Sequence, residues 1–416
     1  MSNDSLQEKG TITPGGRQGA LALIFFVILM DIIGITLLSP VAPRLVLRYS
    51  SSAVMVTMVT VLYAAGQFFA APFLGKVSDK IGRRPVVLIS LVGQAAGYLV
   101  FALGGAMWVL LLGRLIGGIT SGNLSTSNAY IADVSKPEER SKNFALISTA
   151  WSLGLILGPA LGGLFGQISL EAPAYIAGAI SLLNALVGFF LLKESLPRER
   201  RDHTPVHLRD LNPVISIFQI GRKPGLLLLL LANALFSFAF NGISSTSALF
   251  AIQKFSATTF QVSFLMISAG IAIAISNSFL VPRWMPRFGE RLAGTGGLLG
   301  LALAAATIFF LPLLWLVYLL NMIYAMMSSF VFPALVTLSV EQVTQQEVGR
   351  LLGVTSAVGS LMGIFGPLWA GLIYDHVMMG SPYWMGQIFF IIAAVILFRT
   401  PPRVQKSSLK AEAIPD

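Results

Sequence analysis

The sequence contains no cysteine and only three histidines among its 416 residues. Without cysteine the chain can form neither a disulfide nor a thiolate metal site, and so few histidines argue against a histidine-based catalytic or metal centre. The sequence also lacks a nucleotide-binding loop and a nucleophile–base pair with recognisable spacing. These absences argue against an enzyme, and we expect neither a cofactor nor a bound metal.

Charged residues are scarce, because Asp, Glu, Lys and Arg make up only 11% of the chain, whereas 55% of it is hydrophobic. Apolar runs of about 20 residues, long enough to cross a hydrocarbon core of about 30 Å as a helix, recur along almost the whole sequence. We therefore predict an all-α protein in a lipid bilayer, with twelve transmembrane helices at about residues 19–39, 53–74, 85–104, 107–131, 142–165, 174–192, 224–249, 259–282, 292–311, 313–338, 351–372 and 383–399.

The formal net charge of +10 would suit a protein that binds nucleic acid, but the distribution of the charge indicates membrane topology instead. If the N-terminus is cytoplasmic, 24 of the 28 Lys and Arg residues fall in inner segments and three in outer loops, as the positive-inside rule requires. The first span has no small-residue cleavage site, so we expect no removable signal peptide. The predicted location is the inner (plasma) membrane, with both termini cytoplasmic and no nucleic-acid partner.

The predicted spans form two groups of six, separated by the longest polar break in the chain. This division gives a cytoplasmic tail, a six-helix bundle, a cytoplasmic linker, a second six-helix bundle and a second cytoplasmic tail, at residues 1–18, 19–192, 193–223, 224–399 and 400–416. An internal repeat supports the division. DKIGRR around Gly82 matches PRFGER around Gly289, at an offset of 207, and GPALGG at Gly158 matches GPLWAG at Gly366, at an offset of 208.

A third landmark lies in the same register. Asp133 and Arg140 precede the fifth span as Glu341 and Arg350 precede the eleventh. Duplicated six-helix bundles in parallel orientation are typical of rocker-type secondary transporters, in which the substrate cavity lies between the halves near the bilayer midplane. The sequence therefore predicts a transporter of this type.

The segment GKVSDKIGRRP, residues 75–85, holds five ionised side chains within eleven residues. Its four bases satisfy the positive-inside rule by themselves, so the segment could be a topology signal and nothing more. That interpretation leaves Asp79 unexplained. An acid among four bases, on a turn with glycines at 75 and 82, suits a latch in which Asp79 receives a helix dipole or a guanidinium and holds the two halves closed on the inside.

These residues also carry a resemblance to a known family. Gly75, Asp79, Gly82, Arg83 and Arg84 match the signature of the loop between spans 2 and 3 in the major facilitator superfamily. The N-terminal half further resembles the twelve-span tetracycline/proton antiporter branch, a group of drug:proton antiporters, in MDIIGITLLSPVAPRL, LYAAGQFFAAPFLGKVSDKIGRRPVVLISL, GRLIGGITSGN, AYIADVSKPEER, GLILGPALGGLFG and ISLEAPAYIAGA. In the C-terminal half the resemblance rests on RFGER and GPLWAG. It implies the major facilitator fold and exchange of a small molecule for protons, and we place Asp133 and Arg140 in the same latch.

Asp31 and Arg114 are the only Asp, Glu, Lys, Arg or His residues well inside the predicted spans. At about 1.5 Å per residue both lie roughly 10–12 Å below the outer surface, so they could pair if spans 1 and 4 face one cavity, as in the superfamily. The pair could be a static bridge that locks two helices together. It could instead be a proton switch, and the arginine of RLIGG is similar to the fourth-span arginine implicated in proton coupling in the family.

The tetracycline antiporters carry further ionisable groups in the membrane, namely an acid in span 3, a histidine in span 8 and an acid in span 9. The corresponding segments of this chain, residues 93–100, 269–279 and 297–306, contain none. Proton coupling in this chain would therefore run through Asp31 alone or would not exist.

The predicted fifth span carries glycines at helical spacing beside a proline. Small residues let helices approach closely, so the pattern could be ordinary helix packing. It is also similar to the antiporter signature of exporters in the superfamily, apart from Ala145 in place of the upstream glycine, and it would then act as a hinge. The residues are Gly154, Gly158, Pro159, Gly162 and Gly163, with a partial copy in the eleventh span at Gly363, Gly366, Pro367 and Gly371.

Polar and aromatic residues near midspan are candidates for the substrate cavity, although each alone is more often packing material than a ligand contact. They are Gln67, Asn123, Asn128, Trp151, Asn233, Phe236, Phe240, Asn241, Tyr324 and Met326. A cavity of amides, aromatic rings and methionine with little charge suits a bulky, amphipathic, weakly charged organic molecule and not a sugar phosphate.

Three classes of function remain open. The leading one is a proton-driven exporter, functional as a monomer, of a drug-like molecule or of an endogenous product such as a siderophore. An uptake symporter or facilitator would accumulate its substrate in cells, and the glycine pattern of the fifth span argues against it. A receptor or scaffold that transports nothing would tolerate the loss of Asp31 and Arg114.

Overall fold

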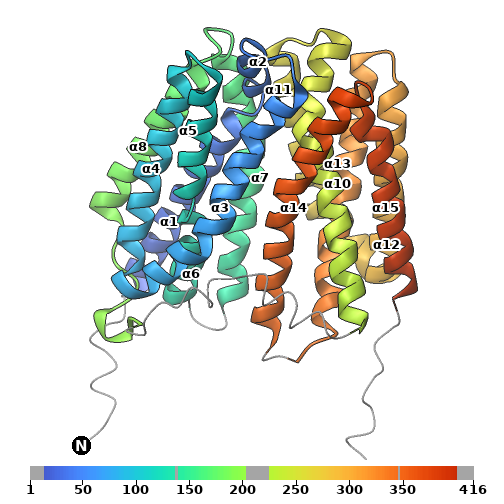
Figure 1. Ribbon diagram of the computed structural model, residues 1–416. Helices are drawn as coiled ribbons and strands as arrows, with labels where there is room; N and C mark the ends of the chain where they lie inside the picture. Colours follow the sequence, from blue (N-terminus) through green and yellow to red (C-terminus); the bar gives the residue numbers. More distant parts are fainter. Residues whose placement is uncertain (1–13, 136–138, 203–223, 345–346, 401–416) are drawn as a thin grey trace, which may run out of the picture.

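The computed structural model describes residues 14–135, 139–202, 224–344 and 347–400, almost all of them helical (Figure 1). The first half contains α1 (Pro14–Leu37), α2 (Ala42–Leu47), α3 (Ala53–Ile81), α4 (Arg83–Leu103), α5 (Met107–Ile119), α6 (Asn123–Val134), α7 (Arg140–Phe165), α8 (Ala172–Leu191) and the 3₁₀ turn η4 (Arg198–Arg200). The second half contains α10 (Pro224–Phe255), α11 (Thr259–Ile275), the π-helical segment η5 (Ser276–Leu280), α12 (Val281–Phe310), α13 (Leu314–Val340), α14 (Val348–His376) and α15 (Ser381–Arg399).

The described residues account for the twelve predicted membrane crossings. Ten helical segments among them are long and apolar enough to span a membrane, and one of these, Thr259–Phe310, holds two predicted spans. The predicted fourth span is divided between the shorter helices α5 and α6. Large apolar side chains cover the outside of the bundle, as lipid contact requires, and Phe69 and Phe310 are both 75% exposed. The predicted class, an all-α multi-pass membrane protein, is confirmed.

At the break in the fourth span, between α5 and α6, two side chains form hydrogen bonds to helical carbonyl groups. Thr120 Oγ1 donates to the carbonyl of Ile116 at 2.8 Å. Ser121 Oγ donates to the carbonyl of Gly118 at 2.7 Å. The break places Asn123, the first residue of α6, in the interior of the bundle, where only 3% of it is exposed.

Two glycines with positive φ interrupt helices at equivalent points of the repeat. Gly82 separates α3 from α4 with φ of 108°, and Gly289 interrupts α12 with φ of 77°. The expectation of a turn bounded by two glycines is wrong, because α3 continues to Ile81 and Gly75 lies within it. Only Gly82 needs the conformation that side chains disfavour.

The two halves meet mainly where α3 packs against α14 and where α7 packs against α11. α1 begins and α15 ends at the end of the bundle drawn at the bottom of Figure 1, here called the lower end. Near the opposite, upper end, a Cβ added to Gly371 of α14 would lie only 2.9 Å from Val54 Cα of α3. Further down α14, no atom lies within 4 Å of a Cβ added to Gly359 or Gly353. The halves therefore touch at the upper end and diverge toward the lower end.

Candidate functional site

Three adjoining chambers, each of about 500 Å³, lie between the two halves. The upper chamber is lined by residues of α1, α3, α5, α7, α10, α11 and α13, including Arg114 and Ser244. The middle chamber is lined by α3, α10, α13 and α14, including Asn233. The lower chamber is lined by α1, α3, α6, α7 and α14, including Asp31. Shared lining residues, such as Gln67 between the middle and lower chambers, make the three one central cavity.

Asp31 lies on α1 in the wall of the lower chamber, with 8% of the residue exposed. Its side-chain hydrogen-bond partners are the amides of Asn123 and Gln94. Gln94 Nε2 in turn donates to Asn123 Oδ1 at 3.3 Å, and the Tyr98 hydroxyl donates to Gln94 Oε1 at 3.2 Å. The carboxyl group is thus held by a neutral network from α4 and α6 and not by a cation.

Arg114 lies on α5 in the wall of the upper chamber. Its Nε donates to the carbonyl of Val59 at 3.3 Å, and its Cζ is 4.6 Å from the centroid of the Tyr63 ring, an arrangement that allows a cation–π interaction. Within the described part of the chain, Nη1 and Nη2 make no hydrogen bond or ion pair. Four N–H groups of the guanidinium are therefore left without a protein partner.

The expected ion pair between Asp31 and Arg114 is not formed. The described residues form ion pairs elsewhere, at Arg48–Glu171, Arg83–Asp79, Arg83–Asp133 and Arg201–Glu194. The physical reason is the packing of the helices. α1 packs against α6, α7 and α8, whereas α5 packs against α3 and α4. The static bridge considered from the sequence is therefore wrong for this state, and the proton switch stays a prediction.

Most of the predicted cavity residues line the three chambers: Gln67, Asn123, Asn128, Trp151, Asn233, Phe240, Asn241 and Tyr324. Two others lie outside their lining. Phe236 packs in the core, with its ring centroid 5.5 Å from that of Phe240, and the carbonyl of Met326 accepts a hydrogen bond from Ser276.

Sequence reasoning missed Tyr63, Gln94 and Ser244. Gln94 carried a usable signal, because a primary amide inside an apolar span needs a partner. Tyr63 and Ser244 carried none, since both residue types are tolerated in membrane helices without a functional role. Their importance depends on which way each helix is turned.

At the lower end, Arg83 joins two carboxylates of the predicted latch. Its Nη1 donates to Asp79 Oδ1 at 2.5 Å and to the Ser78 hydroxyl at 2.7 Å, and its Nε donates to Asp133 Oδ2 at 3.1 Å. Asp79 therefore receives a guanidinium, one of the two partners considered for it. The side chain of Arg140 lies outside the described residues.

Glu194, which follows α8 and was not predicted as part of the latch, caps the N-terminus of α4. Its carboxylate accepts the backbone N–H groups of Arg83 at 2.8 Å and Arg84 at 3.3 Å, where the helix dipole favours an anion. A Cβ at Gly82 would collide with this carboxylate and with the guanidinium of Arg201. These contacts join parts of the first half to each other.

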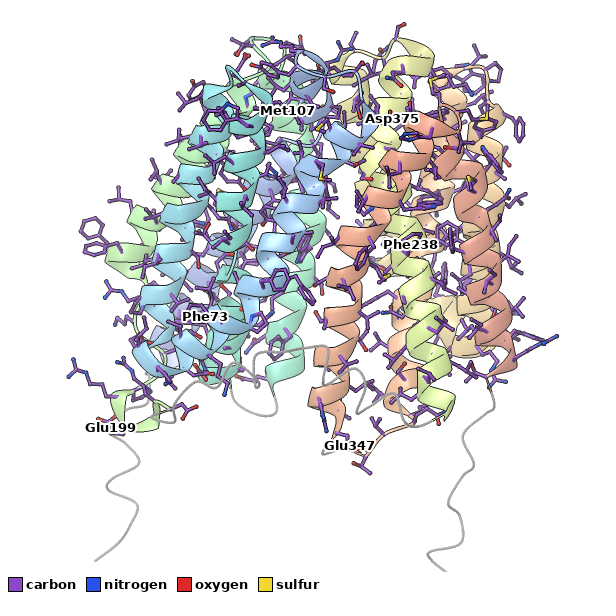
Figure 2. The ribbon with its side chains drawn as sticks, viewed as in Figure 1. Phe73, Met107, Glu199, Phe238, Glu347 and Asp375 are labelled. Carbon is purple, nitrogen blue, oxygen red and sulfur yellow. The ribbon has the colours of Figure 1, made fainter. Side chains whose placement is uncertain are left out.

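At the upper end, Asp375 closes the gap between the halves. It lies near the C-terminal end of α14, whereas Glu347 marks the lower end of that helix (Figure 2). The Asp375 carboxylate accepts hydrogen bonds from Ser52 Oγ at 2.5 Å, from Ala53 N at 2.7 Å and from Val54 N at 3.1 Å. An acid of the second half therefore caps α3 of the first half, and no feature of the sequence singles it out.

A second polar contact joins the halves at the same end. Arg44 Nη2, in α2, donates to the carbonyl of Ala257 at 2.5 Å. Because Ala257 lies between α10 and α11, this bond links the second half to the turn region after α1. At the upper end, a side chain of each half therefore forms a hydrogen bond to the backbone of the other half.

The glycines of α7 fill the predicted role of close packing. A Cβ at Gly154, Gly158 or Gly162 would collide with α1, and a Cβ at Gly163 would collide with Ser263 of α11 in the other half. The pattern therefore makes a seam within the first half and one contact between the halves. Its action as a hinge stays a prediction.

Comparison with known proteins agrees with this geometry. The sequence profile of the Major Facilitator Superfamily matches residues 24–367 and 313–415. The class C tetracycline resistance protein of Escherichia coli is 33% identical over 389 residues, which cover 92% of this chain and 96% of the relative.

Two solved structures share the fold. The human organic anion transporter MFSD10 matches with a TM-score of 0.70 and 27% identity, covering 92% of this chain and 99% of the other. A bacterial homologue of the human lysosomal transporter Spinster matches with a TM-score of 0.74 and 19% identity, covering 93% and 97%. Since the family profile spans far more than half of the sequence, the chain belongs to the Major Facilitator Superfamily and is a transporter, not an enzyme.

Proposed function

We propose that the protein exports a small organic molecule across the inner (plasma) membrane in exchange for protons. The observation that carries the proposal is the setting of Asp31, a buried carboxyl group in the wall of the central cavity. Because neutral amides hold it, Asp31 can bind and release a proton without breaking an ion pair. The relatives named above include a drug-resistance protein and an organic anion transporter, which supports a small organic substrate.

The lower end faces the cytoplasm in this proposal, and the protein works as a monomer. The strong bias of Lys and Arg toward the inner segments supports this orientation. The structure then corresponds to a cavity open to the cytoplasm and closed outside by Asp375 and Arg44. Export requires the reverse state, in which the lower end closes and the upper end opens.

The test is the Asp31→Asn variant in proteoliposomes, with pH-gradient-driven transport measured across a panel that includes tetracycline and organic acids. Asparagine keeps the shape and part of the hydrogen bonding but cannot titrate. We expect gradient-driven transport to be lost while downhill exchange of the same substrate is retained. Glu171→Gln, which removes an acid outside the cavity, is the matched control and should retain the gradient response. Full gradient-driven export by Asp31→Asn would contradict the proposal.

A further inference from the structure

Arg114 is the one charged side chain in the lining of the upper chamber. A charge in the hydrocarbon region is unfavourable unless it is paired or hydrated. The stacking on Tyr63 and the single bond to the Val59 carbonyl satisfy part of the guanidinium only. The chamber therefore contains cationic hydrogen-bond donors that no described residue satisfies.

The acid that could neutralise Arg114 does not do so. Asp31 is turned toward the amides of Asn123 and Gln94 and borders the lower chamber. The residues that line the upper chamber include no Asp or Glu. The guanidinium of Arg114 therefore has no paired acid among the described residues, and the group that complements it best is an anion with two oxygens in one plane, such as a carboxylate or sulfonate.

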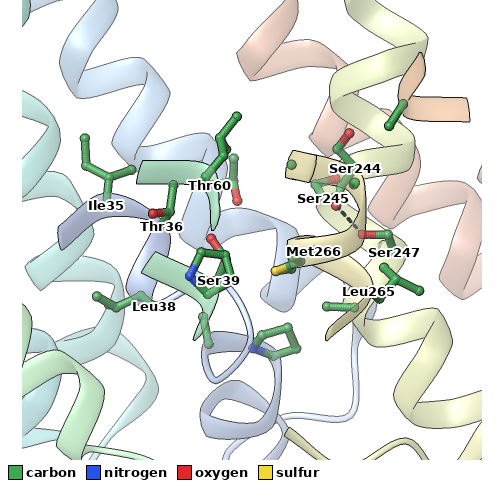
Figure 3. A pocket seen from close by; sticks show the side chains of 18 of the residues that line it. Ile35, Thr36, Leu38, Ser39, Thr60, Ser244, Ser245, Ser247, Leu265 and Met266 are labelled. Atoms are coloured by element: carbon green, nitrogen blue, oxygen red, sulfur yellow. Dashed lines mark hydrogen bonds between the residues drawn. The ribbon is translucent and has the colours of Figure 1, made fainter. Parts of the chain in front are cut away.

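The remaining walls of the upper chamber suit an apolar body. Leu265 and Met266 lie on one wall, opposite Leu38 (Figure 3). The rings of Phe240 and Tyr324 lie parallel, with centroids 5.9 Å apart and an interplanar angle of 1°, and both residues border the chamber. Such a surface favours a flat, unsaturated molecule.

The lining also includes two exposed hydroxyl side chains. Thr60 of the first half and Ser244 of the second face the chamber from opposite walls (Figure 3). They can bond to polar substituents of a ligand without adding charge. A volume of about 500 Å³ lies within the range of pockets for drug-sized molecules, roughly 300–1,000 Å³.

We propose that the upper chamber binds an amphipathic organic anion, with its acid group on the guanidinium of Arg114 and its apolar or aromatic body against Phe240, Tyr324 and Met266. This inference rests on the proposed function, because it names the class of substrate for the same cavity. It also gives Arg114 a direct role in binding, apart from any role in proton coupling.

The test uses three probes with one ring system and different charge: 2-naphthoate, 2-naphthamide and 2-naphthylmethylammonium. Their binding to the purified full-length protein in nanodiscs is measured by calorimetry at neutral pH, without a proton gradient. We expect the carboxylate to bind about tenfold or more tightly than the amide, since a charge-assisted bidentate contact is stronger than a neutral one. The ammonium probe should bind weakest.

Variants connect this preference to one residue. Arg114→Gln should remove the difference between carboxylate and amide, and Arg114→Lys should keep part of it. Arg48→Gln, which removes an arginine paired with Glu171 outside the cavity, is the matched control and should retain the full preference. Thermal unfolding of each variant identifies any that does not fold. If a variant does not fold, the binding of the three probes to the wild-type protein still tests the preference for an anion.

Equal binding of the three probes, tighter binding of the ammonium, or an unchanged preference in folded Arg114→Gln would overturn the inference. The binding assay needs no gradient, so the two proposals fail separately. A preference for the anion in a protein without proton-driven export would contradict the proposed function alone. Proton-driven export of cations only would contradict the anion site alone.

Discussion

The upper and lower ends of the helix pair α3 and α14 both carry an acid near a helix C-terminus, but the two acids differ in what they hold. Asp375 of α14 reaches across to the N-terminus of α3 in the other half. Asp79 of α3 is bound by Arg83 of its own half. An acid is therefore present at both ends of the pair, and its described contacts bridge the halves at the upper end only. We infer that the two ends exchange these contacts as the transporter changes state.

The two lower loops show a second difference. Gly82 and Gly289 share a positive φ, so the repeat preserves the backbone. Glu194 and Arg201 crowd Gly82, whereas no atom lies within 4 Å of a Cβ placed on Gly289. Side chains of the same half therefore pack against the loop at Gly82, and none among the described residues packs against Gly289. We expect mutations beside Gly82 to have larger effects than mutations beside Gly289.

The largest effect is expected from locking the upper end. The chain has no cysteine, so Ser52→Cys with Asp375→Cys introduces the only two thiols. The native side chains are in contact, with Ser52 Oγ 2.5 Å from Asp375 Oδ2, and a disulfide there should form on oxidation. We expect transport to stop completely when the pair is oxidised and to return on reduction, because the upper end can no longer open.

The control for this lock is Asp375→Cys alone, whose activity should not respond to oxidant. Mass spectrometry verifies the disulfide in the double variant. Transport at an unchanged rate by the cross-linked protein would show that the upper end need not open. It would contradict the inference that the two ends exchange their contacts during transport.

The next largest effect is expected at the lower end. Asp79→Asn should lose most transport while the protein still inserts in the membrane, since one charge hardly alters topology. A charge-assisted hydrogen bond contributes about 2 kcal/mol, which shifts a two-state equilibrium about 30-fold. The readout is initial transport rate at equal protein level.

Glu290→Gln is the matched control for Asp79→Asn, because it removes the acid beside Gly289, the equivalent glycine of the second half. Its transport rate should stay near that of the wild type. Normal transport by Asp79→Asn would instead reduce the segment at residues 75–85 to a topology signal.

The smallest effect is expected from Arg48→Gln. Arg48 pairs with Glu171, and both belong to the first half, so the pair does not bridge the two halves. Partial burial raises the pKa of Glu171, but its own backbone N–H and the guanidinium of Arg48 lower it more, so this pKa lies below its usual value. The stabilisation is therefore present above the usual pKa and is lost as the pH falls through the lowered one.

Thermal unfolding of wild type and Arg48→Gln across this pH range is the measurement. We expect a small difference at neutral pH that shrinks in acid and in high salt, with no change in transport. A large loss of transport would show that the contact takes part in opening the upper end.

The twelve spans and the correspondence between Gly82 and Gly289 could be predicted because apolar runs and repeated motifs are local features of a sequence. The absence of an ion pair between Asp31 and Arg114 could not be predicted. Depth in the membrane can be counted from residue number, but the rotation of a helix and its packing partners depend on the whole bundle. Asp375 was missed for a similar reason, since its partner Ala53 lies 322 residues away in the sequence.

The empty space around Gly349, Gly353 and Gly359 of α14 has a consequence for genetic screens. A Cβ at these positions lies within 4 Å of no neighbouring atom in the present state, so a screen for protein abundance should tolerate alanine there. If α14 approaches α3 in the reverse state, the same side chains obstruct it, and a selection for growth in the presence of a toxic substrate should reject them. Positions that pass the first screen and fail the second would trace the surface that closes, without a second structure.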